Sequence, residues 1–73
     1  MTIEEIKAAA ADVAAAMQGG MSEAVRARFI AVRAELFQRG VFDPVLVRFD
    51  SATAPRATND EIAAELTKIA ESL

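Results

Sequence analysis

Two short segments of the form Thr-x-x-Glu, at Thr2–Glu5 and at Thr58–Glu61, mark positions where a helix begins. In such a capping box each side chain binds the free backbone N–H of the other residue, which stabilises the first helical turn. Ser22 is a third N-cap, with Glu23 in the first turn where the helix dipole favours negative charge. Apolar residues recur every three or four positions after all three signals. The sequence therefore predicts an all-α fold.

The first two predicted helices form a hairpin. The first runs from Thr2 to the pair Gly19-Gly20, and the second runs from Ser22 to Gly40, with a basic last turn. Because only a Gly-Gly-Met linker separates them, we expect the two helices to lie antiparallel. The apolar stripe of the first helix is Ile3, Ile6, Ala10, Val13 and Met17.

The second predicted helix has a wide apolar arc, and we expect it to lie at the centre of the fold. Its main stripe is Val25, Phe29, Val32 and Leu36, and Ile30 and Phe37 form a second stripe about 100° around the helix. Arg26 and Arg33 project between the two stripes, away from the face where a solvated charge is expected. They could extend to the rim of the core, pair with a carboxylate such as Asp12 or Glu5, separate two apolar faces, or bind an anion.

A short third helix is predicted after Gly40, because Asp43-Pro44 is a good N-cap and first-position pair and the following apolar residues have helical spacing up to Asp50. A strand over Val45–Phe49 is the alternative, and it would need a partner chain. Ser51–Ala57 is predicted to be a loop, and the last helix carries the apolar stripe Ile62, Leu66, Ile69 and Leu73. The expected architecture is a small three- to four-helix bundle that forms one domain over residues 1–73: an antiparallel helical hairpin, a short third helix and a C-terminal helix.

The composition removes most catalytic chemistry. The chain contains no histidine, cysteine, tryptophan or tyrosine, which excludes cysteine or histidine catalysis, the usual structural zinc sites, histidine-bound haem and disulfides. The adjacent carboxylates Glu4-Glu5 and Asp60-Glu61 lie in first helical turns, where capping and the dipole explain them. We therefore predict no catalytic, cofactor-binding or metal-binding residue, and no enzyme activity.

The supply of large apolar side chains is small for a folded chain. Of the 39 apolar residues 17 are alanine, which leaves 22 larger ones. A second apolar face buried against another protein would add core without adding chain. Ala8, Ala11 and Ala15 lie opposite the apolar stripe of the first helix, where alanine either fills an exposed face or allows a second helix to approach closely.

The leading functional hypothesis is a protein–protein interaction module, either a homo-oligomer or a small accessory subunit that docks on a larger protein. All four phenylalanines lie between Phe29 and Phe49, and several fall where so short a chain has little left to cover them. The candidate interface residues are Ile30, Phe37, Phe42, Val45 and Phe49, with Arg26 and Arg33 as candidate charged contacts.

The alternative is an anion or nucleic-acid binder that uses Arg26, Arg33, Arg39 and Arg48. The net charge of −3 argues against nucleic acid, whose binding proteins are normally basic. The first and last helices are acidic and the second is basic, so their faces are expected to complement one another within the bundle. No apolar run approaches the roughly 20 residues of a membrane span, and the acidic start is unlike a signal peptide, so we expect a cytoplasmic protein.

Overall fold

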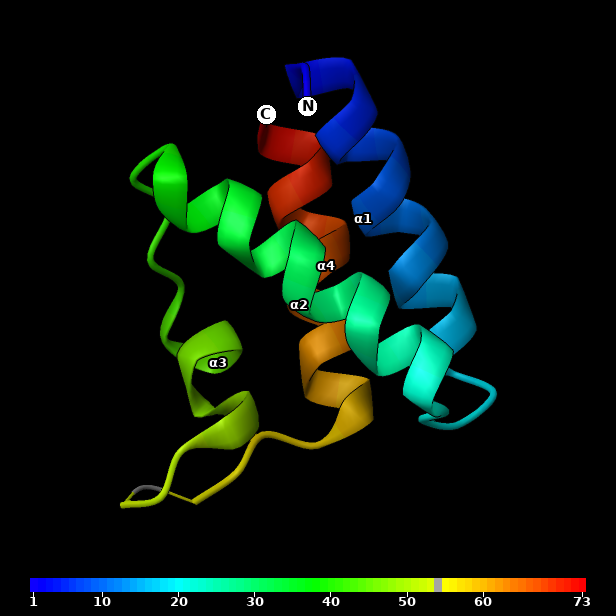
Figure 1. Ribbon diagram of the computed structural model, residues 1–73, viewed down its shortest axis with the longest axis vertical. Coiled ribbons are helices and arrows are strands. Elements are labelled where there is room, and N and C mark those ends of the chain that lie inside the picture. Colours follow the sequence, from blue (N-terminus) through cyan, green and yellow to red (C-terminus); the bar gives the residue numbers. More distant parts are fainter. Residues whose placement is uncertain (54) are drawn as a thin grey trace.

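In the computed structural model, which describes residues 1–53 and 55–73, the chain is folded from helices joined by short connections (Figure 1). The helices are α1 (Ile3–Met17), α2 (Glu23–Gln38), α3 (Pro44–Val47) and α4 (Asn59–Ser72), with the 3-10 helix η1 (Arg48–Asp50) directly after α3. The prediction of a small all-α bundle is confirmed. The alternative of a strand over Val45–Phe49 is wrong, because α3 and η1 occupy that segment.

The helices begin where the local signals predict. Both capping boxes are complete: the Oγ1 of Thr2 accepts from the backbone N of Glu5 at 3.1 Å, and that of Thr58 accepts from the N of Glu61 at 3.1 Å. The Oγ of Ser22 caps α2 in the same way. A side chain only three residues away supplies each cap, so these boundaries depend on the local sequence alone.

The centre of the fold is the pair α1 and α4, which run antiparallel side by side, while α2 crosses them obliquely (Figure 1). We expected α2 at the centre because of its wide apolar arc. Instead α1 and α4 make the most extensive contact between helices. Ala10 and Ala14 of α1 and Ala63 of α4 are buried, and such small side chains let two helices approach closely.

The remaining alanines of α1 stay at the surface. Ala8, Ala11 and Ala15 are exposed, as the interpretation of a filled outer face requires, and they line an open groove of about 670 Å³ between α1 and α4. The exposure of these three alanines agrees with the interpretation that they support helix formation, and the approach of a second helix to them stays a prediction. The buried alanines, Ala10, Ala14 and Ala63, are different positions.

One hydrophobic core joins all the helices. Phe29, Val32 and Leu36 of α2 are buried in it, and Leu46 of α3 and Phe49 of η1 close it from another side. Positive φ angles at Gly20 (110°) and Gly40 (83°) turn the chain after α1 and after α2, a conformation that favours glycine.

The connection before α4 was predicted as the loop Ser51–Ala57. Residues 51–53 and 55–57 lie outside the helices, in agreement with that prediction, and residue 54 lies outside the described residues. Of the helices in the described ranges, none combines the length and the apolar content that crossing a lipid bilayer requires.

Candidate interaction surface

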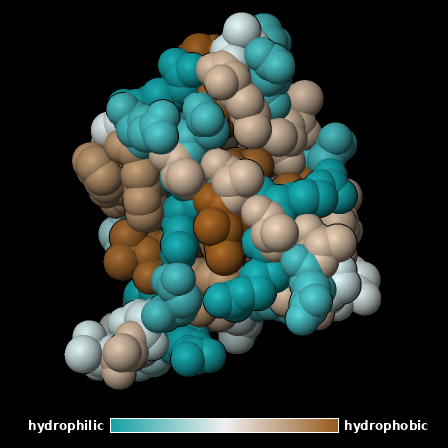
Figure 2. Space-filling view, in the orientation of Figure 1, coloured by the Kyte–Doolittle hydropathy of each residue, from teal (hydrophilic) through white to brown (hydrophobic). Residues whose placement is uncertain are grey.

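The large apolar side chains that are exposed in the described residues lie in two places: Met1 and Ile3 at the start of the chain, and Phe42 and Val47 on the segment from the end of α2 to the end of α3. Phe42 is 66% exposed, and the centroid of its ring lies 5.4 Å from that of the half-buried Phe37. Val45 is half-buried and Val47 is 47% exposed. Figure 2 shows apolar atoms gathered at the left edge of the molecule, over this segment. We call Phe37, Phe42, Val45 and Val47 the Phe42 patch.

Three of the predicted interface residues, Phe37, Phe42 and Val45, belong to this patch, and Ile30 is half-buried on α2. Phe49 does not belong to an exposed surface, which corrects its placement among the interface residues. It is only 9% exposed, and its ring centroid lies 4.5 Å from that of Phe29. Side chains three residues apart eclipse one another in a 3-10 turn, so Phe49 follows Leu46 into the core. Sequence reasoning missed Val47, which lies on a different side of α3 from the buried Leu46.

Arg33 holds the segment that carries the Phe42 patch against α2. Its guanidinium donates two hydrogen bonds to the Asp50 carboxylate, at 2.8 and 3.0 Å, and another to the Leu46 carbonyl at 3.2 Å. The side chain is 14% exposed, and its guanidinium carbon lies 5.7–5.9 Å from the ring centroids of three phenylalanines, Phe29, Phe37 and Phe49. Arg33 therefore pairs with neither Asp12 nor Glu5, and Asp50 occupies the fork that an anion would need.

The Arg33 guanidinium holds the pKa of Asp50 below its usual value, chiefly by hydrogen bonding to the ionised form. A carboxylate whose pKa is lower in the folded chain contributes stability above its unfolded pKa and loses that stability as the pH falls through the folded pKa. The capping boxes also lower the pKa values of Glu5 and Glu61, through hydrogen bonds from Thr2 and Thr58. Acidification should therefore weaken all three interactions.

Asp50→Asn should lower stability at pH 7 and make it less sensitive to acid than that of the parent chain. The parent should lose stability below about pH 4, near the unfolded pKa of an aspartate. The variant keeps the capping-box contribution of Glu5 and Glu61 and lacks only that of Asp50. Thermal unfolding followed by far-UV circular dichroism between pH 7 and pH 2 measures the difference. An identical loss of stability in both proteins would contradict the role given to the Arg33–Asp50 pair.

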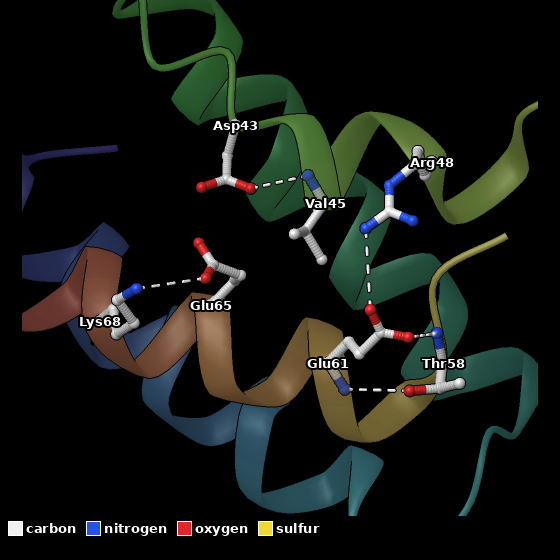
Figure 3. Close-up of polar contacts among 7 residues, drawn as sticks. All are labelled: Asp43, Val45, Arg48, Thr58, Glu61, Glu65 and Lys68. Atoms are coloured by element: carbon white, nitrogen blue, oxygen red, sulfur yellow. Dashed lines mark hydrogen bonds and ion pairs between the residues drawn. The ribbon is translucent and has the colours of Figure 1, made fainter. Parts of the chain in front are cut away.

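The other arginines of the anion-binding hypothesis also have partners within the chain. The Arg26 guanidinium lies 5.1 Å from the ring centroid of Phe49, and Arg39 donates a hydrogen bond to the Met1 carbonyl. Arg48 reaches from η1 to Glu61 at the start of α4, with an N···O distance of 3.7 Å (Figure 3). Each of these arginines therefore has at least one contact within the chain, which for the exposed Arg26 is the ring of Phe49.

Figure 3 shows how polar contacts fix the ends of α3 and α4 on this side. Asp43 caps α3, because its carboxylate accepts a hydrogen bond from the backbone N of Val45 at 2.8 Å. The second oxygen of the Glu61 carboxylate accepts from the backbone N of Thr58 at 3.1 Å, so Glu61 serves the capping box and Arg48 together. The chain around the Phe42 patch is thus held at both ends.

The expected pairing of the basic α2 with the acidic α1 and α4 is absent from the described residues. Their ion pairs join Arg33 to Asp50, Arg48 to Glu61, Lys68 to Glu65, and the Met1 amino group to Glu35. Arg28 has no hydrogen-bond or ion-pair partner among the described residues. Sequence reasoning did not select it, because a charge opposite an apolar arc is the ordinary pattern of a solvated face.

The described residues hold no cluster of three or more carboxylates placed to bind a metal ion. The carboxylates with lowered pKa values, at Glu5, Asp50 and Glu61, are each bound by a capping threonine or by Arg33. Comparison with known protein families, with curated proteins and with solved structures gives no match to this chain.

Proposed function

We propose that this chain is a cytoplasmic, non-catalytic protein–protein interaction module that binds its partner through the Phe42 patch. The observation that carries the proposal is the exposure of Phe42: a phenyl ring that is 66% exposed in a chain with few large apolar side chains. Aromatic side chains of this kind are enriched at the energetic centres of protein interfaces.

The support beneath Phe42 favours binding over an incidental exposure. The ring lies on Phe37, which lies within reach of the Arg33 guanidinium, and Arg33 ties α2 to α3 and η1 through Leu46 and Asp50. A side chain presented on a fixed support loses less conformational entropy on binding than one on a mobile loop. The side chains of the patch therefore already have a fixed arrangement in the unbound chain.

The absence of catalytic function is part of the same proposal. The residue types available are carboxylates, lysine, arginine and hydroxyls, and the carboxylates with lowered pKa values already have partners in the fold. For the alternative, the anion-binding surface, no observation weighs in its favour, because Arg26, Arg33, Arg39 and Arg48 are engaged within the chain.

Phe42→Asp should weaken association with the partner about tenfold or more and leave the fold intact. The loss of an interface aromatic commonly has an effect of this size, whereas a substitution at a mostly exposed position changes stability by about 0.5 kcal/mol or less. The measurement is the solution mass of the isolated chain, by light scattering with refractive-index detection because tryptophan and tyrosine are absent. Affinity capture from a cell extract, with the wild-type chain as bait, accompanies it.

Ile3→Asp is the matched control, since Ile3 is also an exposed large apolar residue, at 41%, and lies on α1. The proposal is supported if the wild-type chain and the control form the same stoichiometric complex, with themselves or with another protein, and Phe42→Asp does not. It fails if the wild-type chain stays monomeric and captures nothing that Phe42→Asp does not also capture.

A further inference from the structure

We propose that the outer face of α2 binds the same face of a second copy of this chain, with the two α2 helices antiparallel. This inference rests on the proposed function, because it assigns a partner to the surface that begins at Phe37 and Phe42. It draws on three features of α2: a seam of small residues, an apolar flank on one side of the seam and a charged flank on the other.

The seam runs along the side of α2 that faces away from the core. Its residues are exposed and follow one another at intervals of three and four: Ala24, Ala27, Ala31, Ala34 and Gln38. Figure 2 shows a diagonal band of pale brown atoms over α2, and in Figure 1 no other helix of the described residues covers this side. An average spacing of 3.5 residues keeps one stripe in register with a second helix, and small side chains allow a short distance between the helix axes.

The two flanks of the seam differ in chemistry. On one side lie Ile30 and Phe37, which are seven residues apart and half-buried, and the ring of Phe37 packs against that of Phe42. On the other side lie Arg28 and Glu35, also seven residues apart and opposite in charge. If the seam residues occupy positions a and d of a heptad, Ile30 and Phe37 occupy position g and Arg28 and Glu35 occupy position e. Positions e and g border the seam on its two sides.

A two-fold axis between antiparallel helices brings each flank against the same flank of the other copy. Arg28 then faces the partner's Glu35, and Ile30 faces the partner's Phe37, and the symmetry repeats both contacts. A parallel arrangement would place Ile30 beside the partner's Glu35, an apolar group against a charge. The distribution of charge therefore favours the antiparallel pair and identifies the partner as a second copy.

One charged side chain of this flank lacks an ion-pair partner within the described residues. Arg28 is exposed and has no hydrogen-bond or ion-pair partner among the described residues. Glu35 lies 3.6 Å from the Met1 amino group, and its side chain remains 27% exposed. The second copy would supply Arg28 with a carboxylate.

The test is a charge exchange followed by solution mass over a dilution series from about 1 µM to about 1 mM, the range of weak to moderate complexes. Arg28→Glu places like charges together at two symmetric positions, and so does Glu35→Arg. Each single variant should raise the dissociation constant of the dimer about tenfold or more, because two attractive contacts become repulsive. An equimolar mixture of the two variants should recover a dimer, because charges of opposite sign would again face each other at both contacts.

Arg56→Glu is the control, because it makes the same change of charge at an exposed residue of the loop before α4. Recovery in the mixture, with no effect of the control, is the expected result, and far-UV circular dichroism checks that each variant is folded. A wild-type chain that stays monomeric up to about 1 mM would overturn the inference, as would single variants that dimerise like the wild type. In either case capture of another protein that depends on Phe42 would leave the proposed function standing.

Discussion

Phe49→Asp should unfold the chain, in contrast to Phe42→Asp, which should leave it folded. The ring of Phe49 is 9% exposed, and its centroid lies 4.5 Å from that of Phe29 and 5.1 Å from the Arg26 guanidinium carbon. The substitution removes this packing and introduces a carboxylate into the core. Loss of a buried phenylalanine alone costs about 3–5 kcal/mol, and a chain of this length has a total stability of roughly 4–11 kcal/mol. Burial of a charge adds to the loss.

The measurement is the midpoint of urea unfolding, followed by the circular dichroism of the helices at 222 nm. Phe49→Leu is the milder companion variant, because it keeps an apolar side chain and should stay folded with reduced stability. If Phe49→Asp unfolded at the same urea concentration as the parent chain, the side chain would have to lie at the surface, and the arrangement of η1 described above would be wrong.

Ala10→Leu should destabilise the chain by about 1–3 kcal/mol, because the added side chain has no space to occupy. Ala10 has no exposed surface, and it lies on α1, the helix that makes the most extensive contact in the fold. A leucine there must either push α1 away from its neighbours or adopt a strained rotamer. Both responses loosen the packing around α1 and α4.

Ala11→Leu is the control for this prediction, since Ala11 is the next residue of the same helix and is exposed in the groove between α1 and α4. It should change stability by no more than about 0.5 kcal/mol. Urea unfolding of both variants gives the comparison. Equal effects at the two positions would mean that the space around the buried Ala10 is not limited by close packing.

The helices were predictable because their boundaries depend on neighbouring residues. Thr2 and Thr58 bind groups three residues away, and the Asp43-Pro44 pair starts α3 in the same local manner. The last helix was expected to pack across the first two, but the central place of the contact between α1 and α4 was not predicted, because an alanine that packs a helix and an alanine that covers its outer face look the same in the sequence. Their burial is decided only when the fold is assembled.

The candidate surface was predictable in part, for a related reason. Phe42 was selected correctly as an exposed aromatic, whereas Phe49 is buried because the 3-10 turn of η1 directs it inward beside Leu46. The pairing of Arg33 with Asp50 spans 17 residues, and no local pattern indicates it. The spacing of the sequence placed Arg33 correctly between two apolar stripes, but it did not predict that Arg33 pairs with Asp50.

The Arg33–Asp50 contact gives this chain a kind of cross-link that does not depend on cysteine. It closes a loop of 17 residues between α2 and η1, as a disulfide could, and the closure limits how far the Phe42 segment can move from α2. A disulfide opens when the surroundings become reducing, and this contact has no redox chemistry. The contact therefore persists at any redox potential and is weakened by acid instead, while the buried Leu46 and Phe49 continue to hold the segment on the core.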